Sequence, residues 1–378
     1  MQILKAYKFE LIPSGEQIRK MKQFCGCSRF VFNRALAYQN EQHEANKSFK
    51  FSYTKLTALL PEWKRELVWL KDCHSQVLQQ SLKDLDRAFK NFFAKRSNFP
   101  KFKRKGEKDS FRFPQGCKLE QQNNRIYLPK IGFIRYRNSR HVSGSLKNVT
   151  VSQKCGKWYV SIQTEFEQET PQPKGGEIGI DMGIARFATL SNGQHFQPIN
   201  AFKTLKGKLA KLQKQFKHKT KFSKNWQKLK AKTAKLHHKI AHIRKNFLHQ
   251  ISSAISQNHA IVYVEDLQIA NMSKSAKGNA EQHGKNVKQK SGLNRAILDQ
   301  SWYEFRRQLE YKLLWSGGYL IAVPPQNTSR CCPICHHTAK ENRQTQEYFE
   351  CVQCAYQNHA DVVGAINVLK RGQQLQAV

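Results

Sequence analysis

Residues 331–361 read CCPICHHTAKENRQTQEYFECVQCAYQNHAD, and this stretch determines how the rest of the chain is interpreted. It holds two Cys-x-x-Cys pairs, Cys332/Cys335 and Cys351/Cys354, with fifteen residues between them. Four thiolates at this spacing suit one tetrahedral zinc ion, which would be structural because no coordination position stays open. Asp361 follows seven residues later, at the head of an apolar helical pattern. The stretch therefore predicts a zinc ribbon beside an acid that could belong to an active site.

The remaining cysteines show no pattern that matches a disulfide framework, so a reducing compartment fits better. The sequence leaves open which residues of the first ribbon pair are the zinc ligands, since Cys331 adjoins the pair on one side and His336 and His337 follow it. The amino terminus has no apolar core with a cleavage site, and no run near eighteen apolar residues occurs. We expect a cytoplasmic protein without a membrane segment. The scattered cysteines are Cys25, Cys27, Cys73, Cys117, Cys155 and Cys331.

Composition indicates a polyanionic partner. The chain has 378 residues and a formal charge of +38, from 65 Lys and Arg against 27 Asp and Glu. Each phosphate that a cation neutralises releases a counterion, so affinity for nucleic acid should be high at low salt and fall steeply as salt rises. Charge alone leaves open a protein that only coats nucleic acid. The length disfavours that reading, because it suffices for two or three domains with their own cores.

The amino-terminal half combines one strand, a helical region and a set of short strands. Apolar and polar residues alternate over 1–11, which predicts a strand. Ser14 is then expected to cap a helix, in a region that stays helical to about residue 97. From residue 112 to residue 166, short β-type runs alternate with turns, as in a small barrel or sandwich that the first strand joins. The helices would then be an insertion. One helical face is predicted to be core: Leu78, Leu82, Leu85, Phe89 and Phe93.

Residues 98–115 interleave aromatic residues with cations and contain two prolines that prevent a long helix. Such a segment can contact phosphates through its cations and stack bases on its aromatic rings. The alternative is a solvated basic linker with a few anchoring aromatic side chains. The candidate nucleic-acid contacts are Lys101, Lys103, Arg104, Lys105 and Arg112.

The carboxy-terminal half predicts a mixed sheet flanked by helices. A linker rich in Gln, Pro and Gly precedes a strand that ends at Asp181, and a later apolar run, typical of a strand buried on both faces, ends at Glu265. The intervening segment is basic and helical, with a break near residues 220–225. The expected order is linker 167–176, strands within 177–193, helices 202–257, strand 259–267, mobile loop 271–292, helix 293–315, strand 319–323, ribbon and helix from 361.

Three acids separated by 84 and 96 residues, Asp181, Glu265 and Asp361, each stand at a strand end or helix start. Strand ends on one edge of an α/β sheet converge, so these acids can form one cluster. Mg²⁺ or Mn²⁺ would relieve their mutual repulsion, and two such ions can activate water and stabilise the leaving oxygen of a phosphodiester. Simpler readings stay open for each acid. Asp181 could shape a turn, Asp266 could be the ligand in place of Glu265, and Asp361 could be a helix N-cap.

Together these residues resemble the TnpB family of transposon-associated proteins, the relatives of type V CRISPR nucleases. Further strings extend the resemblance over almost the whole chain. The matching strings are Gly179-Ile-Asp181-Met-Gly183, Val262-Tyr-Val-Glu265-Asp-Leu267, Thr328-Ser-Arg-Cys-Cys332-Pro-Ile-Cys335, Cys351-Val-Gln-Cys354, His359-Ala-Asp361-Val-Val-Gly-Ala-Ile-Asn367, Cys27-Ser-Arg-Phe-Val-Phe-Asn33, Phe99-Pro-Lys-Phe-Lys103 and Leu128-Pro-Lys-Ile-Gly132.

The resemblance implies a multidomain α/β plus β fold with three parts. A β-rich, oligonucleotide-binding-like wedge domain (1–11 and 112–170) carries a helical recognition domain (12–111) as an insertion. A RuvC-type nuclease domain of ribonuclease H fold (171–378) contains the zinc ribbon (328–358).

The resemblance also implies the activity and its partners. A transposon-encoded guide RNA would direct cutting of double-stranded target DNA beside a short flanking motif. Asp181, Glu265 and Asp361 would be the catalytic ligands of Mg²⁺ or Mn²⁺, and one Zn²⁺ would be structural. Such a protein is expected in the prokaryotic cytoplasm, associated with the nucleoid, as a monomer or a dimer.

The chain departs from the family pattern at three positions. Family ribbons usually place Gly after the second cysteine of each pair, where this chain has His336 and Ala355, and often place a basic residue before the last acid, where it has Ala360. We interpret the first as a turn variation and the second as loss of a substrate contact. Two other functions stay open: an inactive RNA-guided regulator that binds DNA, and a DNA transposase or recombinase that needs no RNA, because ribonuclease H folds also host such enzymes.

Overall fold

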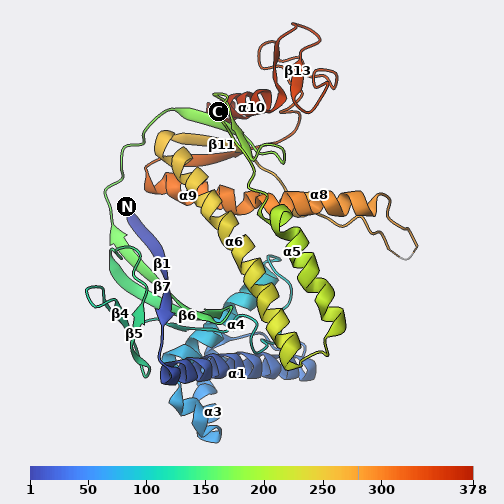
Figure 1. Cartoon of the computed structure of the whole chain (residues 1–378). Helices are drawn as coiled ribbons and strands as arrows, with labels where there is room; N and C mark the ends of the chain where they lie inside the picture. Colours follow the sequence, from blue (N-terminus) through green and yellow to red (C-terminus); the bar gives the residue numbers. More distant parts are fainter. Residues whose placement is uncertain (280, 378) are drawn as a thin grey trace. The chain divides into compact units, whose positions relative to one another are not determined.

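The computed structural model describes residues 1–279 and 281–377, which form two compact units (Figure 1). The first unit runs from Met1 to Gln168 and the second begins at Glu169. This division falls within the stretch 167–176 that the sequence predicts to be a linker. No helix in the described part of the chain is long and apolar enough to cross a membrane.

A seven-stranded antiparallel sheet forms the frame of the first unit, with β2 and β3 at its edges. Strand β1 pairs with β7 along ten residue pairs, from Gln2↔Glu167 to Leu11↔Trp158, and with β5 at its end. The predicted joining of the first strand to the later strands is thereby confirmed, although one sheet forms in place of the two of a sandwich. The strand order is β2 (Ser110–Phe113), β6 (Ser145–Lys154), β7 (Lys157–Glu167), β1 (Gln2–Ile12), β5 (Gly132–Tyr136), β4 (Arg125–Leu128) and β3 (Lys118–Glu120).

The helices of the first unit are inserted between β1 and β2, as predicted. Ser14 caps α1 in a capping box, in which its hydroxyl accepts from the Gln17 amide N–H and the Gln17 side chain accepts from the Ser14 N–H. The predicted face on α4 is buried from Leu78 to Phe89, but Phe93 is 67% exposed because it lies in the last turn, where its ring contacts those of Phe89 and Phe92. The helices are α1 (Gly15–Ala45), α2 (Tyr53–Ala58), α3 (Leu60–Glu66), η1 (Val68–Asp72) and α4 (Ser75–Phe93).

A five-stranded mixed sheet is the centre of the second unit. Strands β8, β11 and β12 are parallel, whereas β9 and β10 continue the sheet as antiparallel hairpins beyond β8. The predicted mixed sheet is confirmed. Its order is β10 (His195–Phe196), β9 (Ala188–Leu190), β8 (Glu177–Asp181), β11 (Ile261–Glu265) and β12 (Tyr319–Val323).

Helices cover both faces of this sheet, because successive strand residues point to opposite faces and both sets are apolar. Ile178, Ile180, Val262 and Val264 pack against α6 (Lys224–Asn258) and α9 (Trp302–Trp315). On the other face, Tyr263 packs against Val368 and Leu369 of α10 (Ala360–Gln376). The sheet is thus the middle layer of three.

Two helical excursions leave this sheet. Helix α5 (Ala201–Gln215) and α6 form an antiparallel hairpin whose apolar stripes face each other, as the leucine spacing predicts (Figure 1). The single helix predicted over 293–315 is wrong: α8 (Val287–Gln300) and α9 are separate. Ser301 between them has a left-handed backbone, φ 59°, and its hydroxyl accepts from Arg244 at 3.2 Å.

The loop predicted over 271–292 is shorter in the structure. Helix α7 (Ile269–Met272) occupies its start, and residues 287–292 of α8 occupy its end. Residue 280, in the middle of this prediction, lies outside the described residues.

Gly179 of β8 allows α10 to lie directly on the sheet. A Cβ at this position would meet the Ala365 carbonyl oxygen at 2.2 Å and the Leu369 nitrogen at 2.6 Å, both of them backbone atoms of α10. Any side chain would therefore push α10 off the sheet.

We predict that Gly179→Ala lowers the melting temperature by several °C or more, because overpacking of this kind typically costs about 1–3 kcal/mol. Gly207→Ala is the matched control, since a Cβ there meets nothing within 4 Å and alanine is the better helix former inside α5. Differential scanning calorimetry tests both changes. Equal melting temperatures for the two variants would contradict the close packing of α10 on β8.

Candidate active site and metal centre

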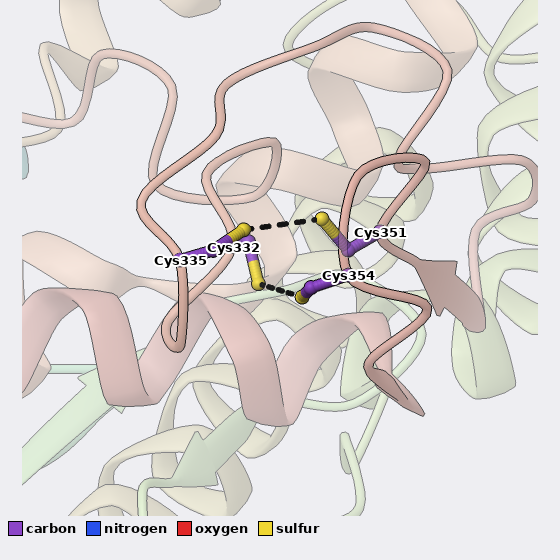
Figure 2. Close-up of side chains that lie close together, drawn as sticks. All are labelled: Cys332, Cys335, Cys351 and Cys354. Carbon is purple, nitrogen blue, oxygen red and sulfur yellow. Dashed lines mark hydrogen bonds between the residues drawn. The ribbon is translucent and has the colours of Figure 1, made fainter.

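The four ribbon cysteines converge on one point from two loops (Figure 2). Their sulfur atoms all lie within 4.8 Å of one another, with 3.6 Å between Cys332 and Cys354 and 3.5 Å between Cys335 and Cys351. Tetrahedral zinc with bonds near 2.3 Å would place its sulfur ligands about 3.8 Å apart. The donor set therefore fits a structural zinc. It includes Cys332 and not Cys331, so the first pair of candidate zinc ligands is Cys332 and Cys335.

Each Cys-x-x-Cys loop closes through a tight turn. The His336 N–H donates to the Cys332 carbonyl at 3.0 Å, and the Ala355 N–H donates to the Cys351 carbonyl at 2.9 Å. Both residues have left-handed backbones, φ 62° and φ 57°. This conformation favours glycine, so the two departures from the family pattern are turn variations that keep the loop at some cost in strain.

Asp181 and Glu265 occupy neighbouring positions in adjacent parallel strands. Ile180 of β8 is in register with Val264 of β11, so the next residue of each strand is an acid. Residues in register point to the same face, and adjacent strands are about 4.8 Å apart. The two carboxyl groups therefore lie at the carboxyl ends of two neighbouring strands, on the face of the sheet that α10 covers.

Helix α10 brings Asp361 to the same edge. A Cβ at Gly364 would lie 3.3 Å from the Asp181 carboxyl carbon, so α10 passes beside Asp181 at that point. Asp361 is three residues earlier and shares this face of the helix, one turn away. It is not the N-cap, as one reading of the sequence allowed, because His359 holds that position and its Nδ1 accepts from the Asp361 N–H at 3.2 Å.

Burial disfavours ionisation of two of these carboxylates, and like charge adds to the effect at Asp181. Burial, followed by the charges of Glu265 and Asp361, raises the pKa of Asp181 to about 8. Burial also raises the pKa of Glu265, against the opposing effect of its hydrogen bond from Thr328. A divalent cation bound by oxygen ligands would relieve both penalties. Among the described residues, only the four cysteines have ligand atoms all within 4.8 Å of one another, so the three acids do not reach that spacing together.

Glu265 is held by a buried network that residue spacing alone did not reveal. The Thr328 hydroxyl donates to Glu265 Oε1 at 2.6 Å. Asn367 of α10 donates to the carbonyls of Thr328 and Cys331, both at 2.7 Å. Thr328 and Asn367 both belong to the strings that resemble the family, and this resemblance is the feature of the sequence that could have identified them. The network fixes the carboxylate and links α10 to the start of the ribbon.

Arg343 is a second site residue that the sequence analysis missed. Its guanidinium lies 3.8 Å from Asp361 Oδ1 and donates to the Gln346 carbonyl at 3.2 Å. The neighbouring Asn342 is fully buried, donates to the carbonyls of Arg330 and His337, and so fixes the ribbon loop. One arginine between two Cys-x-x-Cys pairs gives no sequence signal. The ribbon thus supplies a cation to the acid cluster.

Asp266, the alternative ligand to Glu265, has a different partner. Its carboxylate pairs with Arg306 of α9 at 2.5 Å and is half-exposed, whereas Glu265 is 7% exposed. The structure therefore places Glu265, and not Asp266, beside Asp181.

The predicted nucleic-acid contacts in the first unit differ in availability. Lys101, Arg104 and Lys105 are exposed. Lys103 lies 4.0 Å from the Phe32 ring centre and 3.8 Å from the Asp84 carboxylate, and the Arg112 side chain donates to Thr150. Lys103 and Arg112 therefore have partners within the fold.

Comparison with known proteins identifies the family. Three family models match: a probable transposase over residues 161–276, a Cas12f1-like TNB domain over 302–368 and a helix-turn-helix domain over 1–48. An Escherichia coli K12 protein, InsQ, named as a candidate RNA-guided DNA endonuclease, is 56% identical across 100% of this chain and 94% of its own. This chain belongs to the TnpB family, which is related to the type V nucleases.

More distant relatives of this TnpB-family protein carry similar names. A candidate RNA-guided DNA endonuclease from Streptomyces pristinaespiralis is 32% identical over 98% of this chain and 90% of its own. Among solved structures, the mini RNA-guided endonuclease CRISPR-Cas_phi3 aligns over 98% of this chain and 92% of its own, with 10% identity and a TM-score of 0.40.

We predict that the purified TnpB-family protein contains one zinc per chain and that removing this zinc loosens α10. Cys332, Phe349 and Cys351 of the ribbon share a small core with Ala360 and Val363 of α10, so the ribbon supports the helix that carries Asp361. Elemental analysis and thermal unfolding after Cys354→Ser test this, with Cys155→Ser outside the cluster as control. Retention of full zinc content and stability in Cys354→Ser would contradict the site.

The raised pKa of Asp181 predicts a pH-dependent gain in stability for Asp181→Asn. Between the ordinary value of 3.8 and about 8, the folded protein keeps a proton that the unfolded chain loses. Wild-type stability therefore falls as pH rises through this window, whereas asparagine does not titrate. Without magnesium or manganese, the melting temperature of the variant should exceed that of wild type by several °C at pH 8, and by little at pH 4.

Magnesium should reduce this difference by stabilising the wild-type protein only. A constant difference from pH 4 to pH 8 would show that Asp181 is not held among buried acids.

Proposed function

We propose that this protein is a transposon-encoded, RNA-guided DNA endonuclease that hydrolyses phosphodiester bonds in target DNA. The observation that carries the proposal is the convergence of Asp181, Glu265 and Asp361 at one edge of the sheet. It stands in a chain that is 56% identical, over its whole length, to a relative named for this activity. The fold of the second unit is consistent with a RuvC-type nuclease of the ribonuclease H class.

Three carboxylates would hold divalent cations, Mg²⁺ or Mn²⁺, by hard oxygen ligands. When bound, two such ions supply a water nucleophile and charge stabilisation for in-line displacement at phosphorus. Glu265 is oriented for ligation by Thr328, whose hydroxyl donates to its Oε1. Arg343 beside Asp361 can exchange the carboxylate for a phosphate oxygen when DNA enters, since arginine pairs well with phosphate.

The charge of +38 supports nucleic acid as both guide and target. Helix α6 of the α5–α6 hairpin keeps its leucines against α5 and its lysines outward, so this helix offers a cationic surface for an RNA backbone or an RNA–DNA duplex, held by shape and charge. The exposed Lys101, Arg104 and Lys105 offer a second such surface, with Lys103 and Arg112 supporting it.

We also propose how each of the two units divides into domains. We assign residues 1–11 and 112–170 to a wedge domain, 12–111 to a recognition domain and 171–378 to the nuclease domain with its zinc ribbon at 328–358. A cytoplasmic site of action on nucleoid DNA follows from the proposed substrate.

A DNA transposase that needs no RNA is the second candidate. It is favoured by the match over residues 161–276 to a family described as a probable transposase. The two candidates differ in whether cleavage follows the sequence of a bound RNA.

We predict that Asp361→Ala abolishes guided cutting while RNA binding stays within about twofold of wild type. Loss of a ligand to the cations removes several kcal/mol of transition-state stabilisation, so cleavage should fall at least about 100-fold. Cleavage of a matched plasmid by the protein–RNA complex and a filter-binding assay provide the two readouts. Asp266→Asn, a neighbouring acid that pairs with Arg306, is the control and should cut within about threefold of wild type.

Cutting that survives in Asp361→Ala, or loss of RNA binding together with cutting, would contradict the catalytic assignment. Cutting that proceeds equally without RNA would favour the transposase.

A further inference from the structure

A cavity of about 600 Å³ lies in the second unit, and its lining residues do not include the three acids. Helix α5 contributes Lys203 and Lys206 to its wall, and α8, which contacts α5, contributes Arg295 and Asp299. The loop after β8 contributes Ile184, and the ribbon contributes Gln346. Four separate parts of the unit thus build one concave surface.

The cavity is electropositive. Lys203, Lys206 and Arg295 are exposed, and no carboxylate in the described part of the chain lies within ion-pair distance of them. Asp299, the acid in the wall, is buried and already satisfied. It accepts from the backbone N–H groups of Phe202 and Lys203 at 3.0–3.2 Å and pairs with Arg244 at 3.3 Å. Three cations therefore line the cavity, and none of them pairs with a carboxylate of the described residues.

Two wall residues connect the cavity to the proposed active site. Ile184 lies three residues after Asp181, in the loop that follows β8. Arg343 bonds the Gln346 carbonyl at 3.2 Å and lies 3.8 Å from Asp361. A polymer bound at the acids would reach the cavity within a short length of chain.

We propose that this cavity binds a nucleotide of the cut DNA strand next to the scissile phosphate. Lys203, Lys206 and Arg295 would contact its phosphate, and Ile184, Ala185 and Pro198 would contact its sugar and base. The volume exceeds that of a lone phosphate and falls in the range of nucleotide-sized ligands. Binding a phosphate that does not react would fix the register of the strand over the acids. This inference rests on the proposed function.

Lysine acetylation followed by mass spectrometry tests the cavity without requiring cleavage. The full-length protein is labelled without added magnesium or manganese, alone and with the single-stranded oligonucleotide d(T)8. Lys203 and Lys206 should lose most of their reactivity, whereas Lys208 and Lys211, exposed on the same helix and outside the cavity, should change little. Equal protection of all four lysines, or none, would overturn the proposal even if the protein proves to be a nuclease.

The protein–RNA complex provides the second arm. Lys203 and Lys206 should stay reactive with guide RNA alone and become protected when target DNA is added. Protection by RNA alone would assign the cavity to the guide and overturn the proposal.

Cleavage kinetics provide the third arm. The triple variant Lys203→Gln/Lys206→Gln/Arg295→Gln should bind target DNA within about twofold of wild type but cut about 10- to 100-fold more slowly, because the strand is misplaced over the acids. Lys208→Gln/Lys211→Gln is the matched control and should cut like wild type. Unchanged cutting in the triple variant would refute the positioning role, whereas an inactive wild type that still shows the lysine protection would refute only the proposed function.

Discussion

The parallel pairing of β8 with β11 is the constraint on which the rest of this structure depends. Its register sets Asp181 beside Glu265, although 84 residues separate them in the chain. Gly179 then allows α10 to lie on the same face, so that Asp361 completes the cluster. A register shift of one residue between these strands would put Asp181 and Glu265 on opposite faces of the sheet. The chemistry of the site therefore follows from the pairing of two short strands.

The ribbon extends this constraint beyond the sheet. It shares a core with the first turn of α10, and Asn367 and Arg371 of α10 bond the carbonyls of the segment that leads into it. In return it places Arg343 against Asp361. A cysteine ribbon that looks purely structural thus positions both an acid-bearing helix and a cation of the candidate active site.

The sequence predicted the elements well where one local pattern was decisive. The strands that end at Asp181 and Glu265, the Ser14 cap and the ribbon pairs each depend on a few neighbouring residues. It failed where distant contacts decide. Nothing local showed that Ser301 breaks a helix, because Arg244, from α6, binds it there. Arg343 was missed for the same reason: its partner, Asp361, reaches it only through the folded ribbon. The assigned roles of the acids stay predictions.

The most direct test of this account is an anomalous difference map from crystals of the protein soaked in Mn²⁺. The account predicts manganese peaks in contact with Asp181, Glu265 and Asp361, in addition to a zinc peak among the four cysteines. These peaks should disappear in Asp181→Ala while the zinc peak stays. A map with the zinc peak alone, or with manganese bound away from the three acids, would contradict the claim that strand pairing assembles a metal-dependent active site.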